Sequence, residues 1–261
     1  MSNITTEQVK ELRDKTGVSV MQCRKALEEA SGDMEQALVM LRKKGAEIAE
    51  KKSDRAAADG LIVVKSDGKR ALTLILNCET DFVAKNDDFI TLANKLVDIS
   101  WNEGADAARA QAPALISDVV LKIGENIQLG DIAEITGDVI GSYVHHTGKT
   151  AAIVVLTGGS VEIAKDIAMH AAAMRPAFLS SSEITEEAKA TATSVFQKEV
   201  DESGKPDDIK AKMLEGKLFG YFKEQTLLDQ PFFKNPEKTI AQYAGDNGAS
   251  VDKFVLYTVT V

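Results

Sequence analysis

The chain has 261 residues and a formal net charge of −9, with 31 lysines and arginines against 40 aspartates and glutamates. An apolar share of 44% with 27% charged residues is ordinary for a folded protein and excludes disordered, collagenous and disulfide-scaffold compositions. The length permits one large domain or two to three smaller ones. The acidic balance argues against a general nucleic-acid binder, which needs a basic face to displace counterions from phosphates, so we expect a protein partner or a small ligand.

The sequence carries no signal for export or membrane insertion. Its first 17 residues lack a basic segment followed by an apolar one, and no stretch of about 18 uncharged apolar residues occurs anywhere. We therefore expect a cytoplasmic protein that does not bind membranes. Cys23 and Cys78 each lie in an apolar pattern, which indicates two buried free thiols in a reducing compartment instead of a disulfide.

Residues 1–55 predict three short helices that pack as one small bundle. Each predicted helix begins with a capping side chain and a glutamine three residues later: Thr5 with Gln8, Ser19 with Gln22, and Asp33 with Gln36. We expect Gly17, Gly32 and Gly45 to mark the ends of these helices. Apolar residues at three- and four-residue spacing give each helix one buried stripe, and residues 51–59 then indicate a solvated linker.

After the linker the apolar period becomes that of a strand. Residues 61–64 and 72–76 predict two strands joined by a hairpin turn at Asp67-Gly68. A helix capped by Asn86 follows, and its buried stripe consists of Phe89, Leu92, Ala93, Leu96 and Val97. The same order of strand, turn, strand and helix returns over residues 141–176, which predicts an internal duplication.

Residues 180–228 predict two helices joined by the break SGKPDD, an antiparallel helical hairpin. The apolar residues of its two arms exceed what a pair of helices can hide from water: Val195, Phe196, Val200, Ile209, Met213, Leu214, Leu218 and Phe222. Surplus apolar surface on a protruding hairpin indicates self-association, so we expect a homodimer through residues 180–228. The final segment, Val251 to Val261, alternates as a strand that rejoins the core.

Together these elements predict an α+β protein with four units. They are an N-terminal three-helix bundle (1–55), a first core subdomain (56–138), a second core subdomain (139–179 and 229–261) and the inserted helical hairpin (180–228).

Three sets of residues resemble catalytic or metal-binding motifs, and the sequence around each favours a structural role. The GKT segment at 148–150 lacks the upstream glycine of a phosphate loop and lies in a hairpin, so it is rejected as a nucleotide site. His145 and His146 are adjacent and on a strand would point to opposite faces, and His170 has no Glu or His four residues later, so no metal site is expected. Cys78 with a histidine could form a nucleophile and base pair, yet it continues the apolar face of a packed strand.

The segment NCETDFVAK, residues 77–85, is harder to explain by packing alone. An apolar strand ends there, Thr80 and Asp81 favour a turn or a helix cap, and Phe82 falls at the tip of that turn. Periodicity alone favours Phe82 folding back over the edge of the core. The alternative is an exposed anchor in a protein interface, a role for which a rigid aromatic beside a carboxylate is suited.

Several segments resemble the bacterial elongation factor Ts family, which exchanges nucleotide on elongation factor Tu. The specific ones are LRDKTGVSVMQCRKAL at 12–27 and LNCETDFVAKN at 76–86. Shorter segments follow in the right order: IGENI at 123–127, GSYVH at 141–145, IAMHAAAMRP at 167–176 and SGKP at 203–206. The resemblance thus covers nearly the whole chain.

The resemblance implies a fold, a function and a set of site residues. It implies an N-terminal domain like the ubiquitin-associated three-helix fold, a duplicated core, an inserted hairpin that dimerises, and no cofactor or covalent chemistry. It implies that the chain binds GDP-bound and nucleotide-free elongation factor Tu and displaces Mg²⁺ to release GDP. The residues that correspond to the exchange motif are Thr80, Asp81, Phe82 and Val83, and those that correspond to docking surfaces are Leu12, Val20, Met21 and His145.

Two other functions remain open on the sequence. The chain could be a cysteine-dependent hydrolase that uses Cys78, or a passive scaffold that binds partners through its three-helix bundle. Some members of the resembled family continue into a C-terminal helical module, and because this chain ends at Val261 we expect that contact to be absent.

Overall fold

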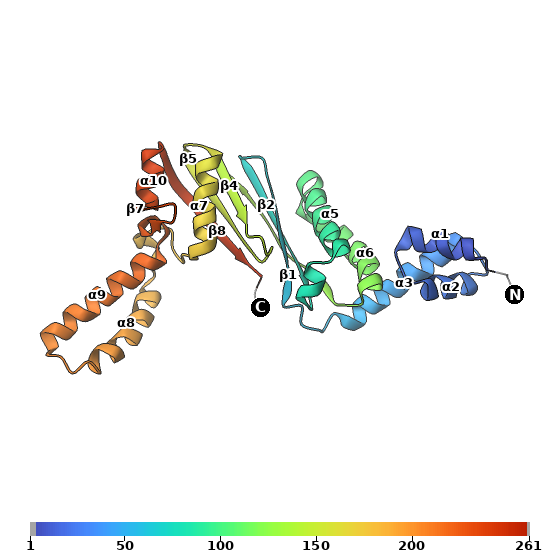
Figure 1. Cartoon of the computed structure of the whole chain (residues 1–261), viewed down its shortest axis with the longest axis horizontal. Helices are drawn as coiled ribbons and strands as arrows, with labels where there is room; N and C mark the ends of the chain where they lie inside the picture. The colour runs from blue at the N-terminus through green and yellow to red at the C-terminus, as the bar shows by residue number, and fades with distance from the viewer. Residues whose placement is uncertain (1–3, 260–261) are drawn as a thin grey trace.

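The computed structural model describes residues 4–259 and shows an elongated α+β molecule (Figure 1). The three N-terminal helices lie at one end, the helical hairpin lies at the other, and the two sheets lie between them. Between residues 4 and 259, every helix is too short or too polar to span a bilayer.

The N-terminal bundle consists of α1 (Thr6–Thr16), α2 (Val20–Glu29) and α3 (Met34–Lys52). The three predicted helix starts are confirmed, because Thr5, Ser19 and Asp33 each accept a hydrogen bond from the backbone N–H three residues later. Gly17 ends α1 with the expected left-handed φ of +68°. The apolar stripes meet in one core, and its fully buried members are Leu12, Cys23, Leu27 and Ala37.

The prediction that Gly45 ends the third helix is wrong, since α3 continues to Lys52. A Cβ atom on Gly45 would lie 2.6 Å from the backbone oxygen of Ser117, which belongs to α6 (Ala105–Ile123). The glycine therefore allows two helices to approach closely. The long α3 consequently packs against both the bundle core and the first core subdomain, with Ile48 in contact with both.

The first sheet has the strand order β1-β2-β3 and is antiparallel throughout, with β1 at Asp59–Ser66, β2 at Arg70–Cys78 and β3 at Ile127–Thr136. One face carries α5 (Asp87–Glu103) and α6, and the predicted stripe of α5 is buried there as expected. The predicted hairpin turn lies one residue further on. Asp67 pairs with Arg70 and its carboxylate accepts hydrogen bonds from the N–H groups of Lys69 and Arg70, so Gly68 and Lys69 form the turn and only Gly68 has positive φ.

The second sheet repeats this plan with the order β4-β5-β8, formed by β4 (Val139–Val144), β5 (Thr150–Gly158) and β8 (Ala249–Thr258). Helix α7 (Val161–Met174) covers it as α5 covers the first sheet, and α10 (Ile240–Asp246) precedes its last strand. The repeated order of strand, turn, strand and helix is thereby confirmed. The predicted last strand is observed up to Thr258, and its final two residues lie outside the described chain.

The two sheets pack against each other on the faces that carry no helices. Ile153 and Val155 of β5 meet Ala71 of β2 and Ile135 of β3 in one cluster. Strand β5 is therefore covered on both faces, which explains its uninterrupted apolar run AAIVVL.

The inserted hairpin consists of α8 (Glu186–Asp201) and α9 (Asp207–Gln225). A 3₁₀ turn (Ser181–Glu183) leads into it, and a second 3₁₀ turn (Leu227–Asp229) and the short strands β6 (Pro231–Phe232) and β7 (Asn235–Thr239) lead out. None of the residues of α9 is fully buried, and Phe219 is 73% exposed. Of the predicted surplus apolar residues, Val195 and Ile209 are exposed, whereas Val200 is fully buried, so the prediction holds only in part.

Candidate functional site

Phe82 lies on a single exposed helical turn, α4 (Asp81–Ala84), directly after β2. Its side chain is 82% exposed, whereas Val83 and Ala84 are buried against the core. The prediction from periodicity that Phe82 folds back over the core edge is therefore wrong. The strand period ends at Cys78, and in the helical turn that follows, Val83 and Ala84 take the inward positions and leave Phe82 outside.

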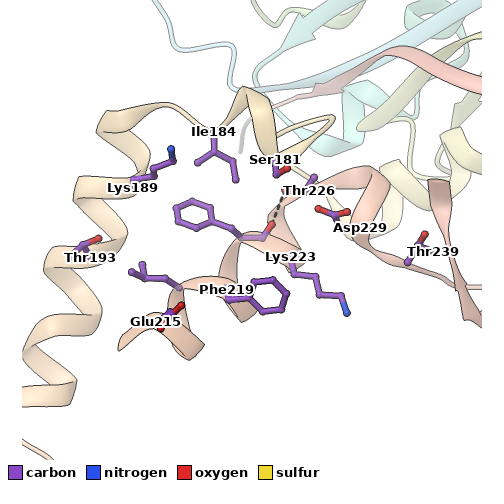
Figure 2. Close-up of a pocket in the computed structure, with 12 residues that line it drawn as sticks. Ser181, Ile184, Lys189, Thr193, Glu215, Phe219, Lys223, Thr226, Asp229 and Thr239 are labelled. Carbon is purple, nitrogen blue, oxygen red and sulfur yellow. Dashed lines mark hydrogen bonds between the residues drawn. The ribbon is translucent and has the colours of Figure 1, made fainter. Parts of the chain in front are cut away.

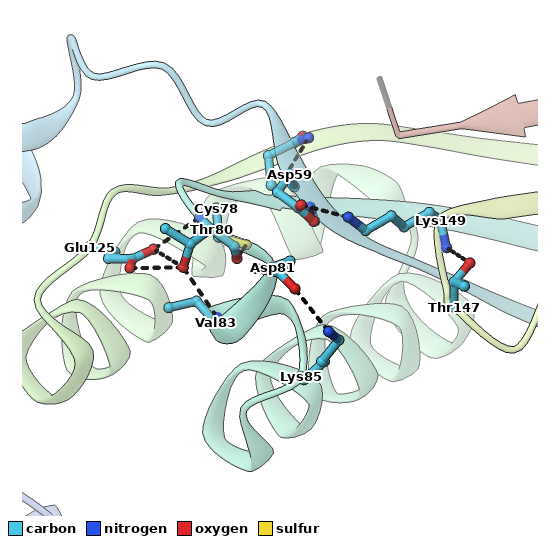
Figure 3. Close-up of polar contacts among 11 residues, drawn as sticks. Asp59, Cys78, Thr80, Asp81, Val83, Lys85, Glu125, Thr147 and Lys149 are labelled. Carbon is cyan, nitrogen blue, oxygen red and sulfur yellow. Dashed lines mark hydrogen bonds and ion pairs between the residues drawn. The ribbon is translucent and has the colours of Figure 1, made fainter. Parts of the chain in front are cut away.

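Thr80 and Glu125 hold this turn, here called the Phe82 tip (residues 80–84). The Thr80 hydroxyl caps α4 by accepting from the Val83 N–H at 3.4 Å. Glu125 accepts from the Thr80 N–H at 3.1 Å and from the Thr80 hydroxyl at 2.9 Å (Figure 3). The tip therefore has a fixed base, while the Phe82 side chain is left largely uncovered by residues 4–259.

Asp81 stands beside Phe82 and forms an ion pair with Lys85, with 2.8 Å between Nζ and Oδ2 (Figure 3). The hydrogen bond from Lys85 lowers the pKa of Asp81, so its carboxylate is ionised at neutral pH. Because the pair is solvent-exposed, it contributes little to stability, and either partner is free to exchange it for another charge.

The turn between β4 and β5 approaches the tip from the second sheet. Lys149 forms an ion pair of 2.6 Å with the buried Asp59 of β1 (Figure 3). The Ile62 N–H also donates to the Gly148 oxygen at 2.8 Å. A groove of about 420 Å³ separates this turn from the tip, and its lining includes Lys85 and His145. The groove thus brings the predicted contact His145 beside Ala84 and Lys85, which directly follow the predicted contacts at residues 80–83.

The prediction that His145 and His146 lie on a strand and point to its opposite faces is wrong, because both residues lie beyond the end of β4. Their ring centroids are 4.2 Å apart, and the Tyr143 hydroxyl lies 3.3 Å from Nδ1 of His145. Within residues 4–259, no three His, Cys, Asp or Glu side chains gather closely enough to hold a metal ion.

The predicted docking residues of the N-terminal bundle separate into two kinds. Val20 is 55% and Met21 80% exposed, on the first turn of α2. Leu12 is fully buried in the bundle core, so its prediction as a contact residue is wrong. It occupies the inward stripe of α1 and supports the surface instead of forming it.

Cys78 does not have the environment of a nucleophile. The residue is fully buried, its thiol donates to the Thr80 backbone oxygen at 3.2 Å, and burial is the main cause that raises its pKa to about 12. The sulfur is therefore a protonated thiol at neutral pH, and the thiolate that a cysteine hydrolase requires does not form.

An exposed aromatic on a braced turn, a neighbouring groove and a separate apolar patch on α2 are typical of a chain that acts by contact with another protein. Comparison with known sequences gives the family. The sequence model described as "Elongation factor TS" matches residues 79–260. An elongation factor Ts from Cellvibrio japonicus is 41% identical, covering 98% of this chain and 90% of the relative, and one from Nitrosospira multiformis is 40% identical, covering 99% and 91%. The chain belongs to the elongation factor Ts family.

Sequence reasoning missed the residues that brace the tip. Glu125 and Asn126 lie in the IGENI segment, which the resemblance singles out without assigning it a role. Asp59 and Lys149 carry no local signal, because only the packing of the two sheets brings them together.

Proposed function

We propose that this chain is the nucleotide exchange factor for elongation factor Tu, and that it binds the GDP-bound form, accelerates GDP release and leaves when GTP binds. The observation that carries the proposal is the Phe82 side chain, 82% exposed on a turn whose base is fixed. As a member of a family of translation elongation factors, the chain is proposed to act in the cytoplasm.

The mechanism follows from how a GTPase retains GDP. Backbone N–H groups surround the phosphates, and a Mg²⁺ ion bridges phosphate oxygens and protein ligands. In our proposal Phe82 inserts between partner side chains next to that ion, and the carboxylate of Asp81 accompanies it. Thr80 and Val83 hold the turn on the core, so that on binding the ligands of the partner's Mg²⁺ ion move and the tip stays in place.

Two further surfaces position the tip on the partner. Val20 and Met21 dock at one end of the molecule, and His145 docks across the groove from the tip. Contacts on separate elements of one chain raise the effective concentration of each at its own site. Elongation factor Tu therefore meets an extended surface instead of a single residue.

Exchange of this kind needs no acid, base, nucleophile or cofactor from this chain. If the chain weakens nucleotide binding, nucleotide weakens binding of the chain by the same ratio. The tip contributes only through contacts that are better in the nucleotide-free state, since equal affinity for both states would shift nothing.

Release of fluorescent GDP from elongation factor Tu, followed by stopped flow, tests the proposal. Wild-type chain should accelerate release, Phe82→Ala should lose most of the acceleration, and Phe219→Ala, a comparably exposed phenylalanine on the hairpin, should keep it. Binding without acceleration would instead identify a passive scaffold. Acceleration by Phe82→Ala equal to wild type would remove the tip from the mechanism.

We also propose that the hairpin mediates a homodimer. A groove of about 640 Å³ lies between its arms and its base, with the apolar side chains of Ile184, Leu218, Phe219 and Phe222 in its lining (Figure 2). Light scattering of the wild-type chain should give a mass that rises with concentration toward that of two chains, and Phe219→Glu should hold it at one. A monomeric wild type at high micromolar concentration would contradict this proposal.

A further inference from the structure

The Phe82 tip and the linker from the N-terminal bundle are fastened to the same short loop. This segment, here called the brace loop (residues 124–128), consists of the connection from α6 to β3 and the first two residues of β3. It forms hydrogen bonds with the residues directly before the tip and with the residues directly after α3. The two segments also touch directly, because the guanidinium of Arg55 in the linker donates to the carboxylate of Glu79 at 3.4 Å. The loop adds the hydrogen bonds that hold each segment from a third side.

On the linker side, the central residue of the contact is Asn126, whose side chain is buried at 2% exposure. Its Nδ2 donates to the Arg55 backbone oxygen at 2.6 Å, and Nε2 of Gln128 donates to the Ser53 oxygen at 2.9 Å. The ammonium of Lys52, the last residue of α3, also donates to the Gly124 oxygen. The exit of the N-terminal bundle is thus fixed by side chains of one loop.

On the tip side, the bonds run in both directions. Glu125 accepts from the N–H and the hydroxyl of Thr80, and Glu79 accepts from the Asn126 N–H at 2.6 Å. The Asn126 N–H is the main cause of the lowered pKa of Glu79, with Arg55 adding a second contribution. Hydrogen bonds to ionised carboxylates are the stronger kind.

The Phe82 tip needs such a brace more than other parts of the fold do. Helix α4 has four residues, too few to be stable alone, and the Phe82 side chain that it carries is 82% exposed. A side chain that displaces metal ligands in another protein is itself pushed back, so the turn that carries it must be held rigidly. If the tip were flexible, it would move on binding and the ligands of the partner's metal ion would stay in place.

Resting on the proposed function, we propose that Glu125 and Asn126 are positioning residues for nucleotide exchange: Glu125 fixes the Phe82 tip, Asn126 fixes the linker, and the brace loop thereby joins the docking bundle and the tip into one rigid unit. Glu125 acts through Thr80, and Asn126 acts through the linker carbonyls. Neither side chain has to touch elongation factor Tu.

Substitutions of the two residues should change different parameters when the exchange rate is measured against the concentration of this chain. Glu125→Ala loosens the tip and should lower the saturating rate about tenfold, with the half-saturating concentration unchanged because both docking surfaces are intact. Asn126→Ala loosens the linker and should raise the half-saturating concentration about tenfold, with the saturating rate retained. Met21→Ala is the matched control for the second kind of change.

A conservative variant and a parallel control separate positioning from plain stability. Glu125→Gln keeps an oxygen for the Thr80 N–H and should recover a rate between those of Glu125→Ala and wild type, while the melting temperatures of the variants stay close together. Phe82→Ala is measured alongside. If Phe82→Ala slows exchange and Glu125→Ala does not, only the brace is refuted. If Phe82→Ala has no effect, the tip and its brace both leave the mechanism, and the proposed function itself fails only if the wild-type chain does not accelerate GDP release.

Hydrogen exchange of the wild-type chain keeps the inference testable even if a variant does not fold. The amides of Thr80 and Asn126 donate to carboxylates and should be protected to a degree comparable with the amides of β2. Hydrogen exchange of both amides at the rate of an unprotected loop would overturn the brace. The brace would also be overturned if Glu125→Ala and Asn126→Ala changed the saturating rate of nucleotide exchange and the half-saturating concentration to the same extent.

Discussion

At the scale of single residues, His170 shows how a buried polar side chain fixes the base of the hairpin. Its Nδ1 accepts from the Phe233 N–H at 3.3 Å, so the proton lies on Nε2, which donates to Oε1 of Gln230 at 2.9 Å. Gln230 donates in turn to the backbone oxygen of Glu224 in the last turn of α9. Burial is the main cause that lowers the pKa of His170 below its ordinary value of 6.5, so the folded state holds the neutral ring.

This arrangement predicts that stability falls as the pH drops from 7 toward 5. Unfolded His170 titrates near 6.5 and folded His170 at lower pH, so in that range the unfolded state binds more protons and gains relative to the folded one. Urea midpoints should therefore decline on acidification, and His170→Gln should remove this part of the decline. His146→Gln, at an exposed histidine of the turn between β4 and β5, is measured alongside as the matched control. The same slope in His170→Gln as in wild type would show that His170 is not the responsible group.

Cys78 provides a second prediction at this scale. With a pKa raised to about 12 by burial, its thiol should resist a thiol reagent at neutral pH in the folded chain and react after denaturation. Cys78→Ser keeps a donor to the Thr80 oxygen and should cost about 1–2 kcal/mol of unfolding free energy, because it buries a hydroxyl, with nucleotide exchange retained. Rapid labelling of the native chain, together with loss of activity in the serine variant, would restore the hydrolase reading.

The orientation of single side chains is the part of the site that sequence patterns predict least well. Periodicity alone favoured an inward Phe82, although the resemblance placed it in the exchange motif, and Leu12 was expected to face a partner. The structure exposes Phe82 and buries Leu12. In each case the residue type and its neighbours indicated a functional segment. Whether the side chain faces the core or the solvent was decided by packing. For Phe82 the change from strand to helix at Asp81 shifts the repeat that fixes which side faces the core.

At the scale of elements, helix starts and amphipathic stripes follow directly from the sequence. The three N-terminal caps and the whole stripe of α5 agree with the structure because both are local features. Helix α6 was not predicted. Pro113 lies inside this helix. Because α6 packs against both α3 and α5, its apolar residues are spread over several faces, and no single apolar stripe marks the helix in the sequence.

The contact between α3 and α6 gives a prediction that runs against helix propensity. Gly45→Ala adds a good helix former in mid-helix, yet its Cβ would lie 2.6 Å from the Ser117 oxygen, so we expect a loss of about 1–3 kcal/mol of unfolding free energy. Gly216→Ala in α9 is the matched control, because no atom lies within 4 Å of its Cβ, and should gain about 0.5–1 kcal/mol. Urea unfolding of the two variants measures both changes. Stabilisation by Gly45→Ala would mean that the helices are further apart than the structure has them.

At the scale of the whole molecule, the duplication explains where the candidate site lies. Two sheets of the same plan pack face to face, and the tip from the first and the turn that carries His145 from the second lie on either side of one groove (Figure 3). The ion pair of Asp59 with Lys149 and the hydrogen bond from Ile62 to Gly148 hold the two sheets in register there. The repeat was visible in the sequence, but this arrangement depends on how the sheets pack, which no local pattern encodes.

The central claim is that Phe82 acts on the partner's Mg²⁺ contacts, and one measurement addresses it directly. The release rate of fluorescent GDP from elongation factor Tu is compared for wild-type chain and Phe82→Ala, first with Mg²⁺ present and then after its chelation. With Mg²⁺ we expect Phe82→Ala to be slower by about tenfold or more, and after chelation the two rates should converge, because the contact that the ring displaces is already gone. An equal ratio of the two rates in both conditions would contradict the account.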